Sequence, residues 1–166
     1  MDYTIRKLSP EDWEEVRDIY MEGIHAGNAT FESAAPSWEA WDLAHVKECR
    51  LVMTYGDKVI GWAVLSPVSS RCAYSGVAEV SLYFSFDHRG KGKAVMLLKD
   101  LIRCSEQKGF WTLHSGIFPE NIASLSVHKK CGFREIGFQE KVGKMSNGTW
   151  RDVVLVERRS ESVGLV

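Results

Sequence analysis

Three features are scarce in this sequence: an excess of one charge, a long apolar run and clustered cysteine. Lys and Arg number 21 and Asp and Glu 22, for a net charge of -1, so there is no general basic surface for nucleic acid. No stretch approaches the roughly 20 apolar residues of a membrane-spanning helix. The N-terminal MDYTIRKLSPEDW also lacks the apolar run of a signal peptide. We therefore expect no nucleic-acid partner and no membrane partner.

The four cysteines, Cys49, Cys72, Cys104 and Cys131, are scattered, with neither a CxxC pair nor a cluster of histidines nearby. This spacing argues against a zinc site or a disulfide framework, and reduced thiols indicate a cytoplasmic protein that holds no metal. The 166 residues, 45% of them hydrophobic, predict a single domain over residues 1–160. A loosely ordered tail, 161–166, is expected to follow.

Apolar periodicity and turn residues predict an α+β fold with a mixed, mostly antiparallel sheet. The expected strands are Tyr3–Leu8, Leu51–Tyr55, Val59–Leu65, Ala78–Phe86, Trp111–Ile117, Phe133–Phe138 and Asp152–Val156. The expected helices run from Trp13 to about Ile24, then over Trp38–Cys49, Gly90–Lys108 and Glu120–Lys130. This order, β-α-α-β-β-β-α-β-α-β-β, leaves one or two parallel crossings where a helix intervenes.

A positive turn with two glycines, RGKGKA over residues 89–94, stands where the third helix should begin. The first N–H groups of a helix have no internal partner, and the helix dipole adds partial positive charge there. Glycine lets an anion approach the backbone, and Arg89, Lys91 and Lys93 add full charges. The turn therefore predicts a site for a pyrophosphate, although a basic turn that only caps the helix is an alternative. Two familiar nucleotide loops are excluded, since GxxxxGK[ST] is absent and GxGxxG lacks its third glycine.

Two motifs resemble those of the GNAT N-acetyltransferases. The run YFSFDHRGKGKA is similar to the family's acyl-CoA signature, [QR]xxGx[GA], through Arg89, Gly92 and Ala94. The run NIASLSVHKKCGF is similar to its second motif, through Asn121, Ser124, Gly132 and Phe133. The expected order of elements also agrees with that fold, so the resemblance covers nearly the whole chain.

The segment GWAVLSPVSSRCAYSGVAEV resembles more narrowly the phosphinothricin and methionine sulfoximine acetyltransferases. Its GWA, its Pro67, the Arg-x-Ala-Tyr of residues 71–74 and then Glu79 match that group's pattern in order. The group typically has a His at the position of His128, where the wider family usually has Tyr. The runs NATFE (28–32) and GTWRDV (148–153) also resemble the group's substrate loop and late strand.

The resemblance implies a GNAT acyl-CoA N-acyltransferase fold: a twisted sheet flanked by helices, with splayed central strands. It also implies a homodimer that transfers acetyl from acetyl-CoA to the α-amino group of a small amino acid analogue, with no metal. The splay leaves a strand edge open to the extended pantetheine arm of the co-substrate. The implied acetyl-CoA contacts are Leu82, Tyr83, Phe84, Arg89, Gly90, Lys91, Gly92, Lys93, Ala94, Val95, Asn121 and Ser124.

The resemblance makes Glu79 the expected base and His128 a second catalytic residue. The acceptor's ammonium must lose a proton before its nitrogen can attack, and a nearby carboxylate can take that proton. A carboxylate with the ordinary pKa of about 4.3 is a weak base, so the role calls for burial. His128 could be an acid, a base or a positioning group. The alternatives are a solvated Glu and a surface or core His.

A guanidinium binds carboxylates and phosphinates bidentately, so Arg71 is the expected anchor for the acceptor. The other expected substrate contacts are Ser69, Ser70, Tyr74, Glu79, Val80, Ser81 and Phe31. Two further functions stay open. One is a GNAT enzyme for another amine, such as a polyamine, an aminoglycoside or a peptide N-terminus, where a cationic acceptor would call for an acidic pocket. The other is a non-catalytic CoA-binding sensor, which could dispense with Glu79.

Overall fold

A computed structural model describes residues 1–166, and its elements follow in the order expected from the sequence. The strands are β1 Tyr3–Lys7, β2 Leu51–Tyr55, β3 Lys58–Pro67, β4 Val77–Phe84, β5 Thr112–Ile117, β6 Arg134–Lys144 and β7 Trp150–Arg159. The helices are α1 Trp13–Ala26, α2 Trp38–Ala44, α3 Lys93–Gln107 and α4 Ile122–Lys130. Short 3-10 helices lie at Pro10–Asp12, Cys72–Tyr74 and Phe86–His88.

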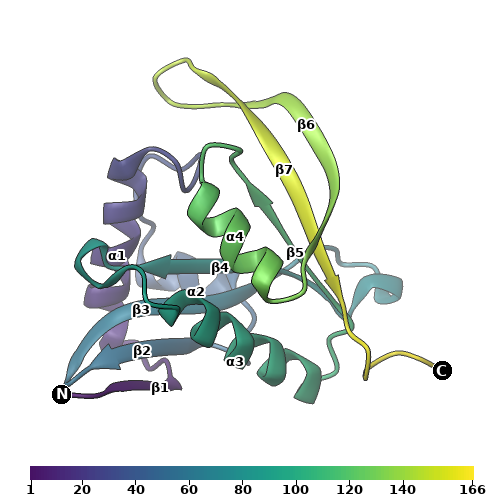
Figure 1. Ribbon diagram of the computed structural model, residues 1–166, viewed down its shortest axis with the longest axis horizontal. Coiled ribbons are helices and arrows are strands. Elements are labelled where there is room, and N and C mark those ends of the chain that lie inside the picture. Colours follow the sequence, from purple (N-terminus) through teal and green to yellow (C-terminus); the bar gives the residue numbers. More distant parts are fainter.

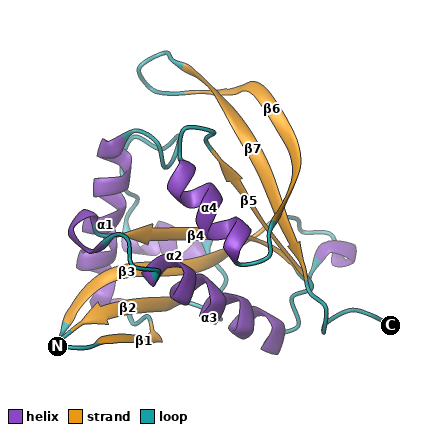
Figure 2. Ribbon diagram, viewed as in Figure 1, coloured by secondary structure: helices purple, strands orange, loops and turns teal.

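The strands form one 7-stranded sheet in the order β1-β2-β3-β4-β5-β7-β6. Every neighbouring pair is antiparallel except β4 and β5, which confirms the mixed α+β fold. Leu97 and Leu101 of α3 belong to one hydrophobic core, whereas Val16 of α1 and Trp41 of α2 belong to another. The two cores lie on opposite faces of the sheet, and Figures 1 and 2 show α3 and α4 on the near face.

Strand β4 separates from β5 soon after the two strands meet. They pair in parallel at only three positions, where Val77, Ala78 and Glu79 face Thr112, Leu113 and His114. On its other side β4 pairs with β3 from Ala78 to Phe84. The β5-facing edge of β4 is therefore open beyond Glu79, which confirms the expected splay of the central strands.

The second helix is shorter than expected, because α2 ends at Ala44 rather than at Cys49. The side chain of Arg50 is buried and donates hydrogen bonds to the carbonyl oxygens of Asp42, His45 and Val46. It also forms an ion pair with the Asp42 carboxylate, at 2.6 Å. A side chain just beyond the end of α2 thus satisfies carbonyls that further helical turns would have used.

The last two strands are longer than the expected Phe133–Phe138 and Asp152–Val156, and they form a long hairpin (Figure 1). Strand β6 lies at the edge of the sheet and is exposed at nearly every residue. Its apolar alternation at Ile136 and Phe138 stops at Glu140, and its register with β7 shifts between Gln139 and Gly143, so its full length could not be read from the sequence.

None of the α-helices combines the length with the apolar composition that a membrane span needs. All four cysteines are free, and no group of three or more His, Cys, Asp or Glu gathers as a metal site would require. The C-terminal residues contact the domain: the Ser162 hydroxyl donates to Glu106, and Arg159 donates to the carbonyl oxygens of Val163 and Gly164.

Candidate active site

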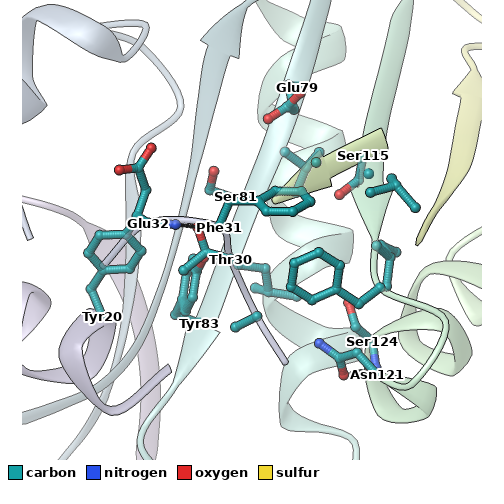
Figure 3. A pocket seen from close by; sticks show the side chains of 18 of the residues that line it. Tyr20, Thr30, Phe31, Glu32, Glu79, Ser81, Tyr83, Ser115, Asn121 and Ser124 are labelled. Atoms are coloured by element: carbon teal, nitrogen blue, oxygen red, sulfur yellow. Dashed lines mark hydrogen bonds between the residues drawn. The ribbon is translucent and has the colours of Figure 1, made fainter. Parts of the chain in front are cut away.

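A cavity of about 970 Å³ occupies the gap between β4 and β5. Figure 3 shows Glu79, Ser81 and Tyr83 in succession along β4. The other residues that line the cavity come from both faces of the sheet. Trp41 and Trp62 lie on the α1–α2 side, and Ser124 and His128 lie on the α4 side. The cavity therefore passes through the sheet, so two reactants could enter from opposite faces and meet beside β4.

The open edge of β4 supplies unpaired backbone groups to this cavity. Leu82 and Tyr83 line it, and Phe84 follows, its side chain in the α3-side core. An amide-containing chain can pair with such an edge as an added strand would. The edge therefore fits the expected contacts of Leu82, Tyr83 and Phe84 with pantetheine.

The glycine-rich turn has the backbone that an anion site requires. Gly90, Lys91 and Gly92 all have positive φ, at 89°, 57° and 74°, and Gly92 is the N-cap of α3. A side chain is strained in this conformation, and nothing lies within 4 Å of where a Cβ would be on either glycine. Arg89 and Lys91 are exposed and form no ion pair with an acid of the chain. The charges of Arg89 and Lys91 and the start of α3 therefore fit a pyrophosphate. Ala94 and Val95 lie in the first turn of that helix.

The charge of Lys93 was expected to join the phosphate site, but the side chain makes other contacts. It is 7% exposed, and its ammonium donates to the His88 carbonyl oxygen at 2.9 Å. The same nitrogen lies 4.7 Å from the centre of the Tyr3 ring on β1. The Lys93 side chain therefore braces the turn against the sheet, and only its backbone lies at the start of α3.

Glu79 lies at the start of the splay, where it lines the cavity with Val80 and Ser81. Its side chain is exposed and has no hydrogen-bonding or ionic partner in the chain. The burial that a basic role calls for is therefore absent from the free protein, and bound reactants would have to provide it.

His128 presents a different environment, because it is only 2% exposed. Its Nδ1 lies 2.8 Å from the Ser124 carbonyl oxygen, which can only accept, so Nδ1 carries the hydrogen. Burial lowers the pKa of His128, partly opposed by this hydrogen bond. The neutral ring then has an Nε2 lone pair, and this buried atom has no partner although the residue lines the cavity. An acceptor here suits a base or a positioning group better than an acid.

Asn121 and Ser124 are engaged in local structure at the start of α4. The Asn121 side-chain oxygen accepts from the Ser124 N–H at 3.2 Å, and its amide donates to the Asn28 carbonyl oxygen at 3.0 Å. Both residues line the cavity, opposite Tyr20 and Glu32 in Figure 3. Asn121 thus joins α4 to the loop that follows α1.

That loop, residues 27–32, is also held by Arg151 of β7. The guanidinium of Arg151 donates to the Gly27 carbonyl oxygen and to the Asn28 side chain, both at 2.8 Å, and to Glu120 at 3.1 Å. It lies 4.0 Å from the centre of the Phe118 ring. The sequence likened NATFE to a substrate loop and GTWRDV to a late strand, and it gave Arg151 no role. The only sequence signal for such a role was that GTWRDV contains a cation, Arg151. The three residues that Arg151 contacts are distant in sequence.

Of the expected substrate contacts, Phe31, Glu79, Val80 and Ser81 line the large cavity. Three others, Ser69, Arg71 and Tyr74, line a second hollow of about 620 Å³, with Glu157 and Arg159. Ser70 lines neither. The Arg71 guanidinium lies 5.5 Å from the centre of the Tyr74 ring and makes no ion pair. His114 lines both hollows, which makes them neighbours.

The family model for the acetyltransferase (GNAT) family matches residues 12–133. This match spans most of the chain and includes β4, the glycine-rich turn and α4. The chain belongs to the GNAT acetyltransferase family. Membership confirms the expected acetyl-CoA-dependent N-acetyltransferase, with acetyl-CoA as co-substrate.

Curated GNAT relatives have narrower names. Phosphinothricin N-acetyltransferase of Alcaligenes faecalis is 30% identical over 165 residues, covering 93% of this chain and 81% of that protein. An L-methionine sulfoximine/L-methionine sulfone acetyltransferase of Pseudomonas paraeruginosa is 26% identical, covering 95% of this chain and 94% of the other. These relatives bear out the resemblance to the phosphinothricin and methionine sulfoximine group.

The fold has a similar solved structure, a GNAT superfamily phosphinothricin acetyltransferase from Sinorhizobium meliloti in complex with acetyl-CoA. It superposes with a TM-score of 0.88 at 26% identity, over 100% of this chain and 92% of that one. This similarity confirms the GNAT fold.

Proposed function

We propose that this GNAT enzyme acetylates the α-amino group of a small amino acid analogue such as methionine sulfoximine, methionine sulfone or phosphinothricin. The observation that carries the proposal is the cavity through the sheet, which Glu79 lines. The glycine-rich turn of residues 89–94 stands at the start of α3. The names of the relatives support the substrate class.

In this proposal the chain holds acetyl-CoA in two places. The backbone at the start of α3, together with Arg89 and Lys91, binds the pyrophosphate. The open edge of β4 pairs with the pantetheine arm and directs the thioester toward Glu79. A backbone N–H of the Leu82–Phe84 segment is the expected donor to the oxyanion that forms during acetyl transfer.

Glu79 then accepts the proton of the acceptor's ammonium, directly or through a water. The freed nitrogen attacks the acetyl carbonyl, and the carbon–sulfur bond breaks. The departing thiolate takes up the second proton that the nitrogen loses, so CoA leaves as a thiol. The Nε2 atom of His128 would accept a hydrogen bond and so help to position a reactant. An acceptor that reaches past His114 would place its anionic group in the second hollow, near Arg71.

A cationic acceptor, such as a polyamine, is the second candidate, and one observation favours it. The charged residues that line the large cavity are Glu32 and Glu79, both acidic, whereas Arg71 lies in the other hollow. An acidic cavity attracts an amine with additional positive charge. Activity with both acceptor classes therefore has to be measured.

The homodimer and the cytoplasmic location also remain proposals. The β6–β7 hairpin carries the exposed apolar side chains of Ile136, Phe138, Val142 and Trp150. A cluster of exposed apolar side chains is typical of a protein–protein contact. The free cysteines suit a reducing compartment.

The base assignment is tested by the kinetics of Glu79→Gln, with thiol release from acetyl-CoA as the readout. Because glutamine keeps the shape but cannot take a proton, kcat should fall by about 100-fold or more. The KM for acetyl-CoA should stay near the wild-type value. An unchanged kcat would remove Glu79 from the role of base.

A further inference from the structure

His114 lies beside Glu79 on the same face of the sheet. The two residues are partners in the parallel pairing of β4 with β5, where neighbouring strands run about 4.8 Å apart. On its other side His114 is the partner of Glu157 on β7. Since paired residues project from the same face, the row Glu79–His114–Glu157 places an imidazole between two carboxylates.

The neighbouring residues leave this imidazole available. Leu113 and Ile117 of β5 belong to the core on the α3 side, so His114 projects to the opposite face. It is partly exposed and has no hydrogen-bonding partner in the chain, as is also true of Glu79. Glu157 accepts from Arg134 at 2.9 Å. His114 lines both the large cavity and the second hollow, so it spans the boundary between them.

We propose that His114 receives, through Glu79, the proton that leaves the acceptor's ammonium and releases it to water in the second hollow. The inference rests on the proposed role of Glu79 as base. His114 is a positioning and proton-transfer residue in this account, since it acts through Glu79 and does not touch the reacting atoms.

The proton balance is simple. The ammonium becomes an amine as Glu79 becomes a carboxylic acid, and Glu79 becomes a carboxylate again as His114 becomes an imidazolium. The imidazolium then loses its proton to water, and no oxidant, reductant or further reactant is needed. Imidazole suits the second step because it ordinarily changes charge between pH 5 and 8, which a carboxylate does not.

Charged groups of both signs surround His114. Glu79 on β4 and Glu157 on β7 would both stabilise an imidazolium, whereas Arg71 and Arg159 in the second hollow would oppose it. The Arg159 guanidinium donates to carbonyl oxygens of Trp111, Ser160, Val163 and Gly164, which directs it toward the C-terminal segment. Of the two carboxylates beside His114 in the row, Glu157 is already paired with Arg134, which leaves Glu79 as the one without a partner in the chain.

The test is imidazole rescue of His114→Ala, with thiol release from acetyl-CoA as the readout. The acceptor is whichever of methionine sulfoximine and spermidine the wild-type chain acetylates. We expect kcat to fall about 10-fold with little change in the KM for acetyl-CoA, and free imidazole to restore most of the loss. His114→Gln, which keeps a polar side chain but cannot take the proton, should be equally slow. His25→Ala, an exposed histidine of α1, is the control and should be unaffected by imidazole.

Several results would overturn the proposal. Wild-type kcat in His114→Ala, recovery in His114→Gln, or a loss that imidazole does not restore would each exclude proton transfer through His114. If Glu79→Gln is slow while both His114 variants are normal, only this inference fails and the proposed function stands. If Glu79→Gln keeps wild-type kcat, or if neither acceptor is acetylated, both fail.

Discussion

Asp12 shows how one carboxylate fixes the start of α1. Its two oxygens accept from the Arg6 guanidinium at 2.8 Å each, and one also accepts from the Ser9 N–H at 2.8 Å. Asp12 is 6% exposed. The hydrogen bond from Arg6 is the main cause that lowers the pKa of Asp12. Burial of the carboxylate opposes this effect, and the hydrogen bond from Ser9 adds to it. The fold therefore favours the charged carboxylate and joins β1 to the first helix.

Asp12→Asn should lower the free energy of unfolding at pH 7 by about 2 kcal/mol, because the charge-assisted hydrogen bonds are lost. Since the folded-state pKa lies below the unfolded value of about 3.9, this stability is present above that pH and is lost as the pH falls through the folded pKa. Urea unfolding at pH 7 and pH 3 measures both effects. A variant with the wild-type pH dependence would show that Asp12 is not responsible.

Single residues differ in how far the sequence can point to them. Glu79 and His128 could be proposed because their residue types occur within recognisable local patterns, and both line the cavity. His114 and Arg151 could not, because their neighbours lie on other strands and loops. Strand register and long-range hydrogen bonds create those relationships, so even the cation in GTWRDV could not be assigned its partners from the sequence.

The glycine-rich turn is a segment whose conformation was implied by its composition. Gly92→Ala places a side chain at φ 74°, with a strain of about 1 kcal/mol. The start of α3 should shift, and the KM for acetyl-CoA should rise about 10-fold while the KM for the acceptor stays unchanged. Gly109→Ala is a matched control, since this glycine has φ 88° just beyond the other end of α3. An equal effect in both variants would mean that general strain, and not the turn, is being measured.

The loop after α1 is a segment that the rest of the chain holds in place. Because Arg151 contacts Gly27, Asn28 and Glu120 through a planar fork, Arg151→Lys should lose most of these bonds. The loop carries Phe31 and Glu32 to the cavity, so we expect the KM for the acceptor to rise about 10-fold with the KM for acetyl-CoA unchanged. Arg103→Lys, on the exposed surface of α3, is the control. Unchanged acceptor kinetics would exclude the loop from acceptor binding.

The element order was predictable because turns and helix caps punctuate the sequence clearly. The lengths of α2 and β6 were not. Side-chain hydrogen bonds from the nearby Arg50 replace the last turn expected for α2, and β6 lies exposed at the edge of the sheet. The separation of Arg71 from the large cavity was also not predictable, because it depends on how loops pack after the sheet forms.

The exposed apolar hairpin bears on how the whole molecule behaves in solution. If Phe138 and Trp150 contact a second copy, the wild-type chain should elute as a dimer in size-exclusion chromatography with light scattering. Phe138→Glu should shift it toward monomer, because a carboxylate is costly to bury at an apolar contact. A wild-type chain that is monomeric at every concentration would contradict the homodimer.

At the scale of the whole molecule, we propose that the chain acetylates the α-amino group of a small amino acid analogue within the cavity through the sheet. The most direct measurement is kcat/KM for thiol release from acetyl-CoA with methionine sulfoximine, phosphinothricin, spermidine and a short peptide, each supplied separately. We expect the highest values for methionine sulfoximine or phosphinothricin, with N-acetylated product found by mass spectrometry. Turnover confined to spermidine or the peptide, or acetyl-CoA binding without turnover, would contradict it.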